Sequence, residues 1–304
     1  MIKSDLIKNR LLVIGSNGML GQRLVEYFSK DQKIELKCAS AENESFIPGV
    51  DYTQLDIRQK NNVREIILDF FPDFVINAAA FTNVDKSESE RETAWKINVT
   101  GVENIALYSW TIDAHLIHIS TDYIFDGKNG PYSESDKPNP IGYYGRTKLA
   151  GENSIRTSGV RFTILRTNIL YGPVRFGRPD FVKWVIDSLR SNKEIRIVTD
   201  QIGNPTFIDD IVASINKIIE SKKEGIYNIA GKETLSRYDF TIRIAKYFGL
   251  DEKLIMPILT DELRQPAPRP LKSGLLTLKA ETEIGFKPRP IESAFALIKK
   301  ELDI

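Results

Sequence analysis

Short apolar runs alternate with segments of helical spacing through the first two-thirds of the chain. The runs that predict strands are 10–15, 33–40, 73–80, 115–120, 161–167 and, later, 224–231. The segments that predict helices are 19–28, 61–71, 86–110 and 144–157. Strands that are apolar nearly throughout, each followed by a helix, indicate a parallel sheet covered on both faces. The predicted fold class is therefore α/β, with a doubly wound parallel sheet.

The pattern changes in the last third of the chain, where Gly, Pro and Arg cluster at 172–179, 202–205 and 266–274. These clusters predict a smaller, loop-rich C-terminal substrate lobe beside the main sheet. The predicted domains are 1–170, with 207–232 returning to it, and a second lobe made of 171–206 and 233–304. Ser236 and Asp239 resemble a capping box, which predicts a helix start.

Composition limits the classes of function. The 304 residues carry 42 basic and 41 acidic side chains, a net charge of +1, which predicts no nucleic-acid or membrane partner. One cysteine excludes an intramolecular disulfide, and one cysteine with two histidines argues against a metal site. The first fifteen residues are interrupted by charges and do not read as a signal peptide. No run approaches the roughly 20 apolar residues of a membrane helix. A soluble cytoplasmic protein is the expectation.

The segment "GSNGMLG" places glycines at 15, 18 and 21, between the first predicted strand and the first predicted helix. Glycine lets the backbone approach a pyrophosphate, and a helix N-terminus supplies amide donors. The segment therefore predicts a dinucleotide loop and a Rossmann-like fold. An ordinary glycine-rich turn is the alternative, because the spacing differs from the commonest G-x-G-x-x-G fingerprint.

The second predicted strand ends without an acidic residue at its tip, since Glu42 lies beyond Ser40. An acid at that tip is typical of sites that hold the 2′-hydroxyl of NAD. NADPH is therefore favoured and NADH remains possible, with Lys37 or Ser40 as candidate contacts to the 2′-phosphate. Ser40 could equally cap a turn. Asp56 could meet the adenine amino group or serve as the N-cap of the next helix.

Two further segments carry candidate chemistry. Ser120, Thr121 and Asp122 end a predicted strand, where a hydroxyl can donate to a substrate carbonyl, although turn chemistry is the alternative. Lys148 follows Tyr144 by four residues, so the two share a helix face, whereas Tyr143 does not. An ammonium one turn away favours the phenolate and lowers the pKa of a tyrosine. Tyr144 is therefore the predicted proton donor, and Tyr143 is expected to line or support the pocket.

Taken in order, "GSNGMLG", "NAAA" (77–80), "STDYIFDG" and "YYGRTKLAGE" resemble the extended short-chain dehydrogenase/reductase family. "NAAAFTNVDKSESE", "DQIGNPT" and the late "PRP" (268–270) are similar to the dTDP-4-dehydrorhamnose reductases within it. The resemblance covers most of the chain. It implies an NAD(P)H-dependent oxidoreductase of dTDP-rhamnose biosynthesis that reduces the C4 ketone of a 4-keto-6-deoxy sugar nucleotide, with that sugar nucleotide as its substrate partner.

The resemblance also implies roles for individual residues. The catalytic residues would be Thr121, Tyr144 and Lys148. The cofactor would contact Gly15, Asn17, Gly18, Met19, Leu20, Ser40, Asp56, Ile57, Ala78, Ala79, Ala80, Tyr144 and Lys148. The substrate would contact Thr82, Val84, Thr121, Asp122, Asn168 and Arg269. The forked guanidinium of Arg269 suits a diphosphate, although a surface arginine between prolines is the alternative.

Several positions depart from the family pattern. Gln22 stands where some members carry a glutamate used in a metal-bridged dimer, so no metal is predicted. Asn168 and Ile169 replace a tryptophan presented to substrate in some members, and Gly142 replaces a frequent asparagine, so the sugar pocket is open to change. Tyr123 stands where dehydratases carry a second acid, which argues against dehydration.

Two other functions stay open. One is a sugar-nucleotide epimerase of the same fold. The other is a non-catalytic partner subunit, because "ILYGPV" and "YIFDGKNGPY" resemble the regulatory β subunit of methionine adenosyltransferase. A homodimer is also an option, since the helices at 86–110 and 144–157 could form a dimer bundle or simply cover the sheet.

Overall fold

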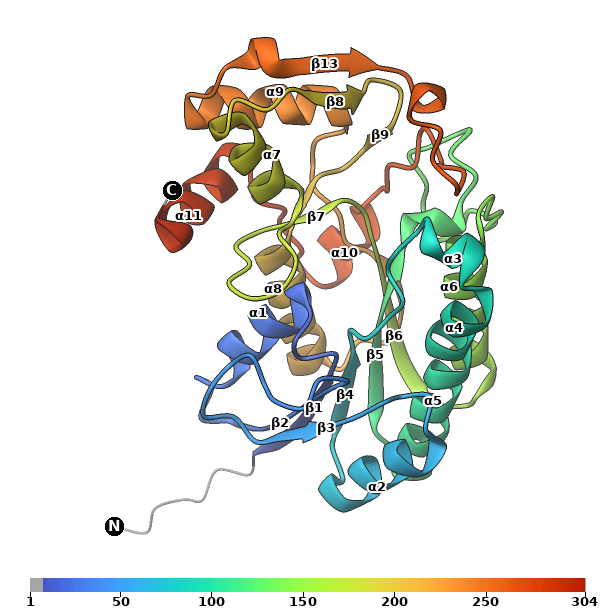
Figure 1. The fold of residues 1–304 in the computed structure, drawn as a ribbon. Coiled ribbons are helices and arrows are strands. Elements are labelled where there is room, and N and C mark those ends of the chain that lie inside the picture. Colours follow the sequence, from blue (N-terminus) through green and yellow to red (C-terminus); the bar gives the residue numbers. More distant parts are fainter. Residues whose placement is uncertain (1–7, 304) are drawn as a thin grey trace.

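The computed structural model describes residues 8–303 and places seven strands side by side in one sheet (Figure 1). The order across the sheet is β11-β6-β5-β4-β1-β2-β3, and every neighbouring pair is parallel. The strands are β1 (Asn9–Ile14), β2 (Ile34–Ser40), β3 (Tyr52–Gln54), β4 (Phe74–Asn77), β5 (His115–Thr121), β6 (Arg161–Thr167) and β11 (Gly225–Asn228). Because the order runs outward from β1 in both directions, the sheet is doubly wound. The predicted Rossmann-like α/β fold is confirmed.

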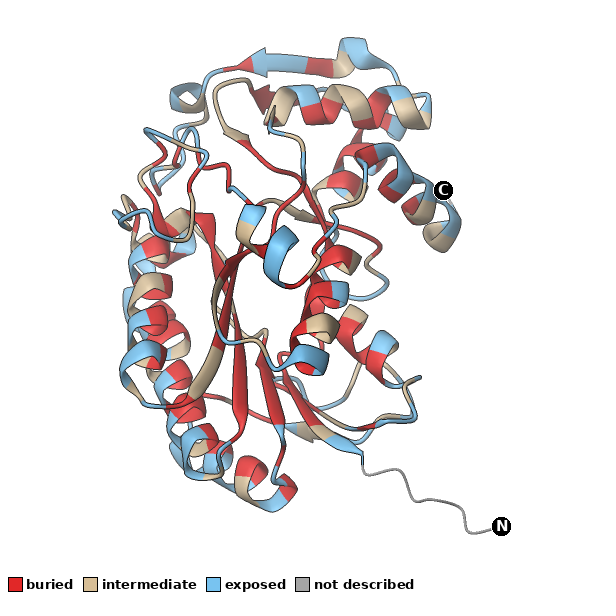
Figure 2. Cartoon of the chain, turned by 180° about the vertical axis from the view of Figure 1, so that it is seen from behind, coloured by how far each residue is buried: buried red, intermediate tan, exposed pale blue. Residues whose placement is uncertain are grey.

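Helices cover both faces of this sheet, and each face has its own apolar core. One layer consists of α1 (Met19–Phe28), α8 (Ile208–Ser221) and α10 (Leu278–Glu283), and the other of α2 (Lys60–Phe70), α5 (Gly101–Thr111) and α6 (Tyr143–Thr157). Successive side chains of a strand point to opposite faces. Leu11 and Val13 therefore pack toward the first layer, and Leu12 and Ile14 toward the second. The strands are buried along most of their length, as Figure 2 shows.

The helix predicted over 86–110 is not continuous. It consists of α3 (Lys86–Ser89), α4 (Arg91–Trp95), a π-helical turn η1 (Lys96–Thr100) and α5. Glu90 leaves the helical region (φ −102°, ψ 48°) and separates the first two pieces. In the π turn the buried Asn98 donates from its amide to the Phe81 carbonyl (3.1 Å) and to Thr147 Oγ1 (3.0 Å). These tertiary bonds explain an irregularity that apolar spacing alone does not reveal.

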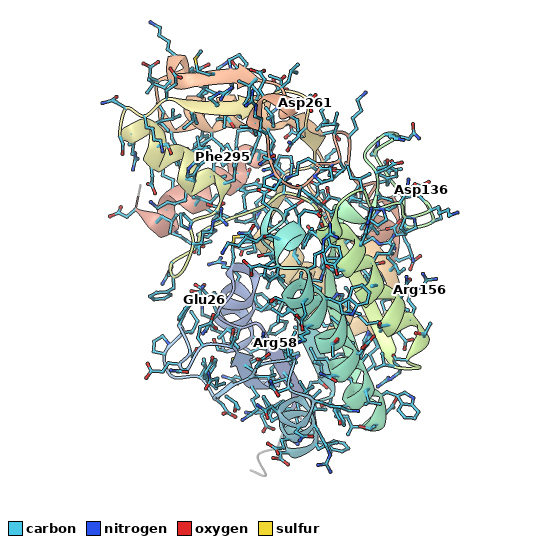
Figure 3. All side chains as sticks on the ribbon, turned by 45° about the vertical axis from the view of Figure 1, so that its right-hand side comes forward. Glu26, Arg58, Asp136, Arg156, Asp261 and Phe295 are labelled. Carbon is cyan, nitrogen blue, oxygen red and sulfur yellow. The ribbon has the colours of Figure 1, made fainter. Side chains whose placement is uncertain are left out.

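A second lobe lies at one end of the sheet and is built around aromatic side chains. Its elements are α7 (Phe181–Arg190), β8 (Ile195–Val198), α9 (Arg237–Phe248), β13 (Ile255–Ile258) and α11 (Ile291–Leu302). The ring of Phe240 packs against Tyr171 (5.2 Å between centroids) and Phe295 (5.9 Å). Figure 3 shows Phe295 in this lobe, whereas Glu26 and Arg58 lie on the lobe of the large sheet. The residue ranges assigned to the two domains stay a prediction.

Short elements connect the two lobes. They are β7 (Leu170–Tyr171), β9 (Ile202–Gly203), β10 (Thr206–Phe207), β12 (Leu235–Ser236) and η2 (Asp122–Ile124). Two further short turns, η3 (Glu252–Leu254) and η4 (Thr260–Leu263), flank β13 within the second lobe. The predicted helix start is confirmed, because Ser236 is the N-cap of α9 and its Oγ accepts from the Asp239 amide (2.9 Å). The capping box is incomplete, since the Asp239 carboxylate accepts from Ser236 Oγ (2.6 Å) and not from the Ser236 amide. Among residues 8–303, no helix combines the length and apolar character needed to cross a membrane. Residues 1–7, part of the segment on which the signal-peptide prediction rests, lie outside the described residues.

Candidate active site

A cavity of about 860 Å³ opens at the carboxyl ends of the central strands. Ligands of open α/β sheets bind at this edge, at the point where the strand order reverses. Most of the residues predicted for the cofactor line the cavity: Gly15, Gly18, Met19, Leu20, Ser40, Asp56, Ile57, Ala78, Ala79, Ala80, Tyr144 and Lys148. Of the residues predicted for the substrate, those in its wall are Thr82, Val84, Thr121 and Asp122.

The glycine loop between β1 and α1 is shaped for close approach of a ligand. Gly15 has φ +83°, and a Cβ there would lie 2.5 Å from the Ala79 nitrogen. Gly18 is the N-cap of α1, with no side chain bonded to the first turn and no acid within it. The first amides of α1 are therefore available to an anion, and the helix dipole favours one. This cradle fits the pyrophosphate of a dinucleotide.

Asn17 and Gln22 support this loop without lining the cavity. The Asn17 amide donates to the carbonyl of Glu44 (2.8 Å) and accepts from the amide of Phe46 (2.9 Å). The Gln22 amide donates to the carbonyls of Asn17 (2.8 Å) and Phe176 (3.0 Å). Asn17 was predicted to contact the cofactor, but its side chain is used to tie the loop to the segment after β2. In the described part of the chain, no three His, Cys, Asp or Glu side chains are grouped as metal ligands.

The end of the cavity next to β2 and β3 carries both signs of charge. Asp56 lines it, but its carboxylate already accepts from Arg58, with 2.7 Å between Nη2 and Oδ2. This pairing lowers the pKa of Asp56 and keeps it ionised. Glu42 also lines the cavity, whereas Lys37 pairs with Asp51 (3.0 Å) and is not in the wall. Arg58 is the basic group at this end, and sequence reasoning missed it.

The other end of the cavity holds the three residues predicted to be catalytic. Thr121 is the last residue of β5, and α6 carries Tyr144 and Lys148 one turn apart. The ring of Tyr143 lies under the guanidinium of Arg91 (5.1 Å) and outside the cavity wall, while its amide donates to Glu88 Oε1 (2.7 Å). Tyr143 therefore supports the start of α6, and Tyr144 is the tyrosine that reaches the cavity.

The predicted lowering of the Tyr144 pKa is wrong for this structure. Burial is the largest influence, and it raises the pKa of Tyr144 above its usual value, together with the nearby Asp122 carboxyl. Burial also lowers the pKa of Lys148 to about 8, against the opposing effect of Glu152. The Tyr144 phenol is thus held in its protonated form, which suits a proton donor.

Thr121 and Asp122 belong to a buried polar cluster that joins the two lobes. Thr121 Oγ1 donates to Asp122 Oδ1 (3.0 Å), and Asp122 Oδ2 accepts from Ser273 Oγ (2.5 Å) and from Asn168 Nδ2 (2.8 Å). Burial raises the pKa of Asp122 to about 6 in spite of these bonds. Asn168 was predicted to contact substrate, but it lies behind the cavity wall, where it fixes Asp122 against the C-terminal segment.

The arginine that lines the substrate end is Arg237. Arg269, the predicted diphosphate contact, pairs with Asp85 (2.9 Å), donates to the Ala267 carbonyl (2.8 Å) and lies outside the wall. Arg237 lines the cavity, and no carboxylate among residues 8–303 forms an ion pair with it. Burial lowers the pKa of Arg237, so an anionic ligand would relieve an unfavourable environment. In the sequence, the segment "LSRYDF" that contains Arg237 predicts only the start of a helix.

The loop at Phe81, next to Thr82 in the cavity wall, is held in place by a residue that sequence reasoning did not select. Asn98, in the π turn, accepts from the Phe81 amide (2.8 Å) and donates to the Phe81 carbonyl (3.1 Å). The same side chain reaches Thr147 on α6. The substrate-side loop is thereby connected to the helix that carries Tyr144, and only a buried polar residue at an interrupted helix could have signalled it.

Comparison with known proteins agrees with this geometry. A family model described as the RmlD substrate binding domain matches residues 9–304. The dTDP-4-dehydrorhamnose reductase of Aggregatibacter actinomycetemcomitans is 34% identical over 95% of this chain and 98% of its own length. The methionine adenosyltransferase 2 subunit beta of Xenopus tropicalis is 32% identical over 92% of this chain and 84% of its own.

A solved structure extends the likeness to three dimensions. The dTDP-4-dehydrorhamnose reductase of Bacillus anthracis, crystallised in complex with NADP, is 31% identical and superimposes with a TM-score of 0.84. The match covers 97% of this chain and 99% of that one. Similarity therefore extends over both lobes and not only over the dinucleotide-binding part.

Proposed function

This chain belongs to the RmlD substrate-binding-domain family, and on that premise we propose that it reduces dTDP-4-dehydro-L-rhamnose to dTDP-L-rhamnose with NADPH. It is an oxidoreductase that uses a nicotinamide cofactor. The proposal rests mainly on how the residues that line one cavity are arranged. A free helix N-terminus lies toward one end, and Thr121, Tyr144 and Lys148 lie at the other, beside Ala78–Ala80.

The chemistry divides between the cofactor and the side chains. When bound, the nicotinamide supplies the hydride for the C4 carbon. Tyr144, protonated because it is buried, gives its proton to the developing C4 alkoxide. Thr121 donates a hydrogen bond to the same oxygen. For this it exchanges its bond to Asp122 for one to substrate. Lys148 holds the ribose and borders Tyr144 on α6.

Preference for NADPH is proposed from the adenosine end of the cavity, where Ser40 and Arg58 line the wall and would contact a 2′-phosphate. Arg58→Ala is expected to raise KM for NADPH by about tenfold, the loss of roughly one charge-assisted hydrogen bond. KM for NADH should stay within about twofold. Steady-state kinetics with both cofactors measures this. Lys37→Ala is the matched control, because Lys37 pairs with Asp51 outside the wall. Equal losses for both cofactors would remove Arg58 from 2′-phosphate recognition.

Arg237 is proposed to bind the diphosphate of the sugar nucleotide in place of Arg269. Arg237→Gln is expected to raise KM for the sugar nucleotide by about tenfold or more, since a guanidinium–phosphate bond is charge-assisted. Arg269→Gln, which removes a guanidinium already paired with Asp85, should change KM by less than about threefold. Initial rates at saturating NADPH provide the comparison. The reverse ranking of the two variants would restore Arg269 as the diphosphate ligand.

The function itself is tested by following NADPH absorbance while the purified protein meets dTDP-4-keto-6-deoxyglucose in the presence of a 3,5-epimerase. Oxidation that depends on both proteins, with dTDP-L-rhamnose as product, is the expected result. Oxidation without the epimerase would point to a different 4-keto sugar nucleotide. A bound cofactor that cycles without net oxidation would favour the epimerase alternative.

A second candidate is a non-catalytic partner subunit, favoured by the 32% identity with a protein named methionine adenosyltransferase 2 subunit beta. The presence of Thr121, Tyr144 and Lys148 in the cavity supports the reductase instead. Size-exclusion chromatography with a methionine adenosyltransferase catalytic subunit separates the two. A stoichiometric complex together with no reductase activity would replace the first proposal.

A further inference from the structure

A chain of buried polar groups runs behind the cavity from α6 to β4. Lys148 Nζ lies 3.2 Å from His118 Nε2 and donates to the Ile119 carbonyl (2.7 Å). The other ring nitrogen, His118 Nδ1, lies 3.1 Å from Asn77 Nδ2. Asn77 Oδ1 accepts from the amide of Ala79 (3.1 Å), a residue in the cavity wall. Asn77 and His118 are completely buried.

The hydrogen-bond donors and acceptors of Asn77, His118 and Lys148 determine which nitrogen atoms carry protons. The Asn77 amide uses its oxygen for Ala79, so its NH₂ group donates to His118 Nδ1. A neutral imidazole carries one proton, which must then be on Nε2. Nε2–H points at Lys148 Nζ, and only the uncharged amine can accept a hydrogen bond. The chain of bonds is complete when Lys148 is neutral.

The charged form of Lys148 requires the opposite set of bonds. An ammonium only donates, so His118 Nε2 must accept and the ring proton moves to Nδ1. Nδ1–H would then face the NH₂ group of Asn77, which is a contact between two donors. The contact is relieved when the Asn77 amide reverses. Its NH₂ group then faces the amide of Ala79, which loses its acceptor.

We propose that His118 and Asn77 form a buried switch that couples the charge of Lys148 to the backbone of Ala79 at the nicotinamide side of the cavity. His118 and Asn77 act here as positioning residues. With the lysine neutral, the Ala79 amide is held by Asn77. With the lysine charged, that amide is released toward the cavity. The inference deepens the proposed function, and its catalytic meaning rests on that function.

The surroundings allow both states. Burial holds the pKa of His118 well below its usual value, so the ring keeps a single proton and changes tautomer rather than charge. The pKa of Lys148 is lowered to about 8, which puts its titration near neutral pH. The charged group that acts on Lys148 is Glu152 on the same helix, which pairs with Arg166 on β6. Asp122, after β5, acts on Tyr144, the neighbour of Lys148 on α6.

The tautomer of His118 can be measured without substrate. The chain has two histidines, so a ¹⁵N-histidine-labelled sample gives two sets of ring signals. His115→Gln assigns them and is the matched control, because His115 lies at the other end of β5 and contacts Thr163 Oγ1 (2.8 Å). We expect the proton of His118 to move from Nδ1 to Nε2 as the pH rises through the titration of Lys148, near 8.

Two variants make the result decisive. In Lys148→Met no amine titrates, so His118 should keep one tautomer from pH 6 to 10. In Asn77→Asp a carboxylate accepts from both Ala79 and His118 Nδ1–H, so the Nδ1–H tautomer should persist to higher pH, by about one pH unit or more. A single His118 tautomer across the titration of Lys148 in the wild type would overturn the proposal, as would a tautomer change that survives in Lys148→Met. Neither outcome depends on whether the protein reduces a dTDP sugar.

Discussion

Tyr144→Phe is expected to lower kcat by about 10²- to 10⁴-fold, the range that general acid catalysis contributes. The substitution removes one oxygen and keeps the ring that packs against Tyr123, with 5.5 Å between ring centroids. Binding of cofactor and sugar nucleotide should therefore change little, and KM should stay within about threefold. Steady-state rates of NADPH oxidation at saturating substrate measure the effect.

Tyr143→Phe is the matched control for this prediction. The two tyrosines are adjacent in sequence, but the Tyr143 ring lies against Arg91 outside the cavity wall. Removing the Tyr143 hydroxyl should lower kcat by less than about threefold. If the two variants lose activity equally, the proton would come from another group. If Tyr143→Phe loses more activity than Tyr144→Phe, the assignment of Tyr144 to the face of α6 that lines the cavity would be incorrect.

The parts of this site that the sequence predicts are those in which neighbours in the chain are neighbours in space. Glycines 15, 18 and 21 lie within seven residues, and Tyr144 and Lys148 lie one turn apart on α6. Local spacing is sufficient for both because strand–loop–helix geometry and the 3.6-residue turn are set by the backbone. The alternation of apolar runs with helical segments predicts the sheet for the same reason.

Contacts between distant segments were not predictable in this way. Arg237 and Arg269 both follow loop-rich sequence, and only the fold shows that Asp85 pairs with the latter while the former faces the cavity. The π turn is accompanied by bonds from Asn98 to Phe81 and Thr147, and apolar spacing does not reveal these bonds. The pKa of Tyr144 follows burial, which is a property of the folded chain and not of its spacing from Lys148.

A second large effect is expected behind the cavity, where a buried ion pair joins α6 to the sheet. Arg166 Nη2 lies 2.7 Å from Glu152 Oε2, and Ser120 Oγ donates to Glu152 Oε1 (2.5 Å). Both charged side chains are at most 2% exposed. Glu152→Gln leaves the guanidinium buried without its counter-charge. We expect the free energy of unfolding to fall by about 3–5 kcal/mol. Urea denaturation measures the change.

The double variant Glu152→Leu/Arg166→Met separates the charge from the packing. Replacing both partners by apolar side chains of similar volume removes the uncompensated charge, so most of the lost stability should return. A single variant as stable as the wild type would show that Arg166 finds another partner, and the nearest is the Glu134 carbonyl, 3.3 Å from Nη1. Glu152 also raises the pKa of Lys148, one turn before it on α6. Its removal should therefore shift the titration of Lys148 to lower pH, so this buried carboxylate affects both the stability of the fold and the charge of the lysine in the site.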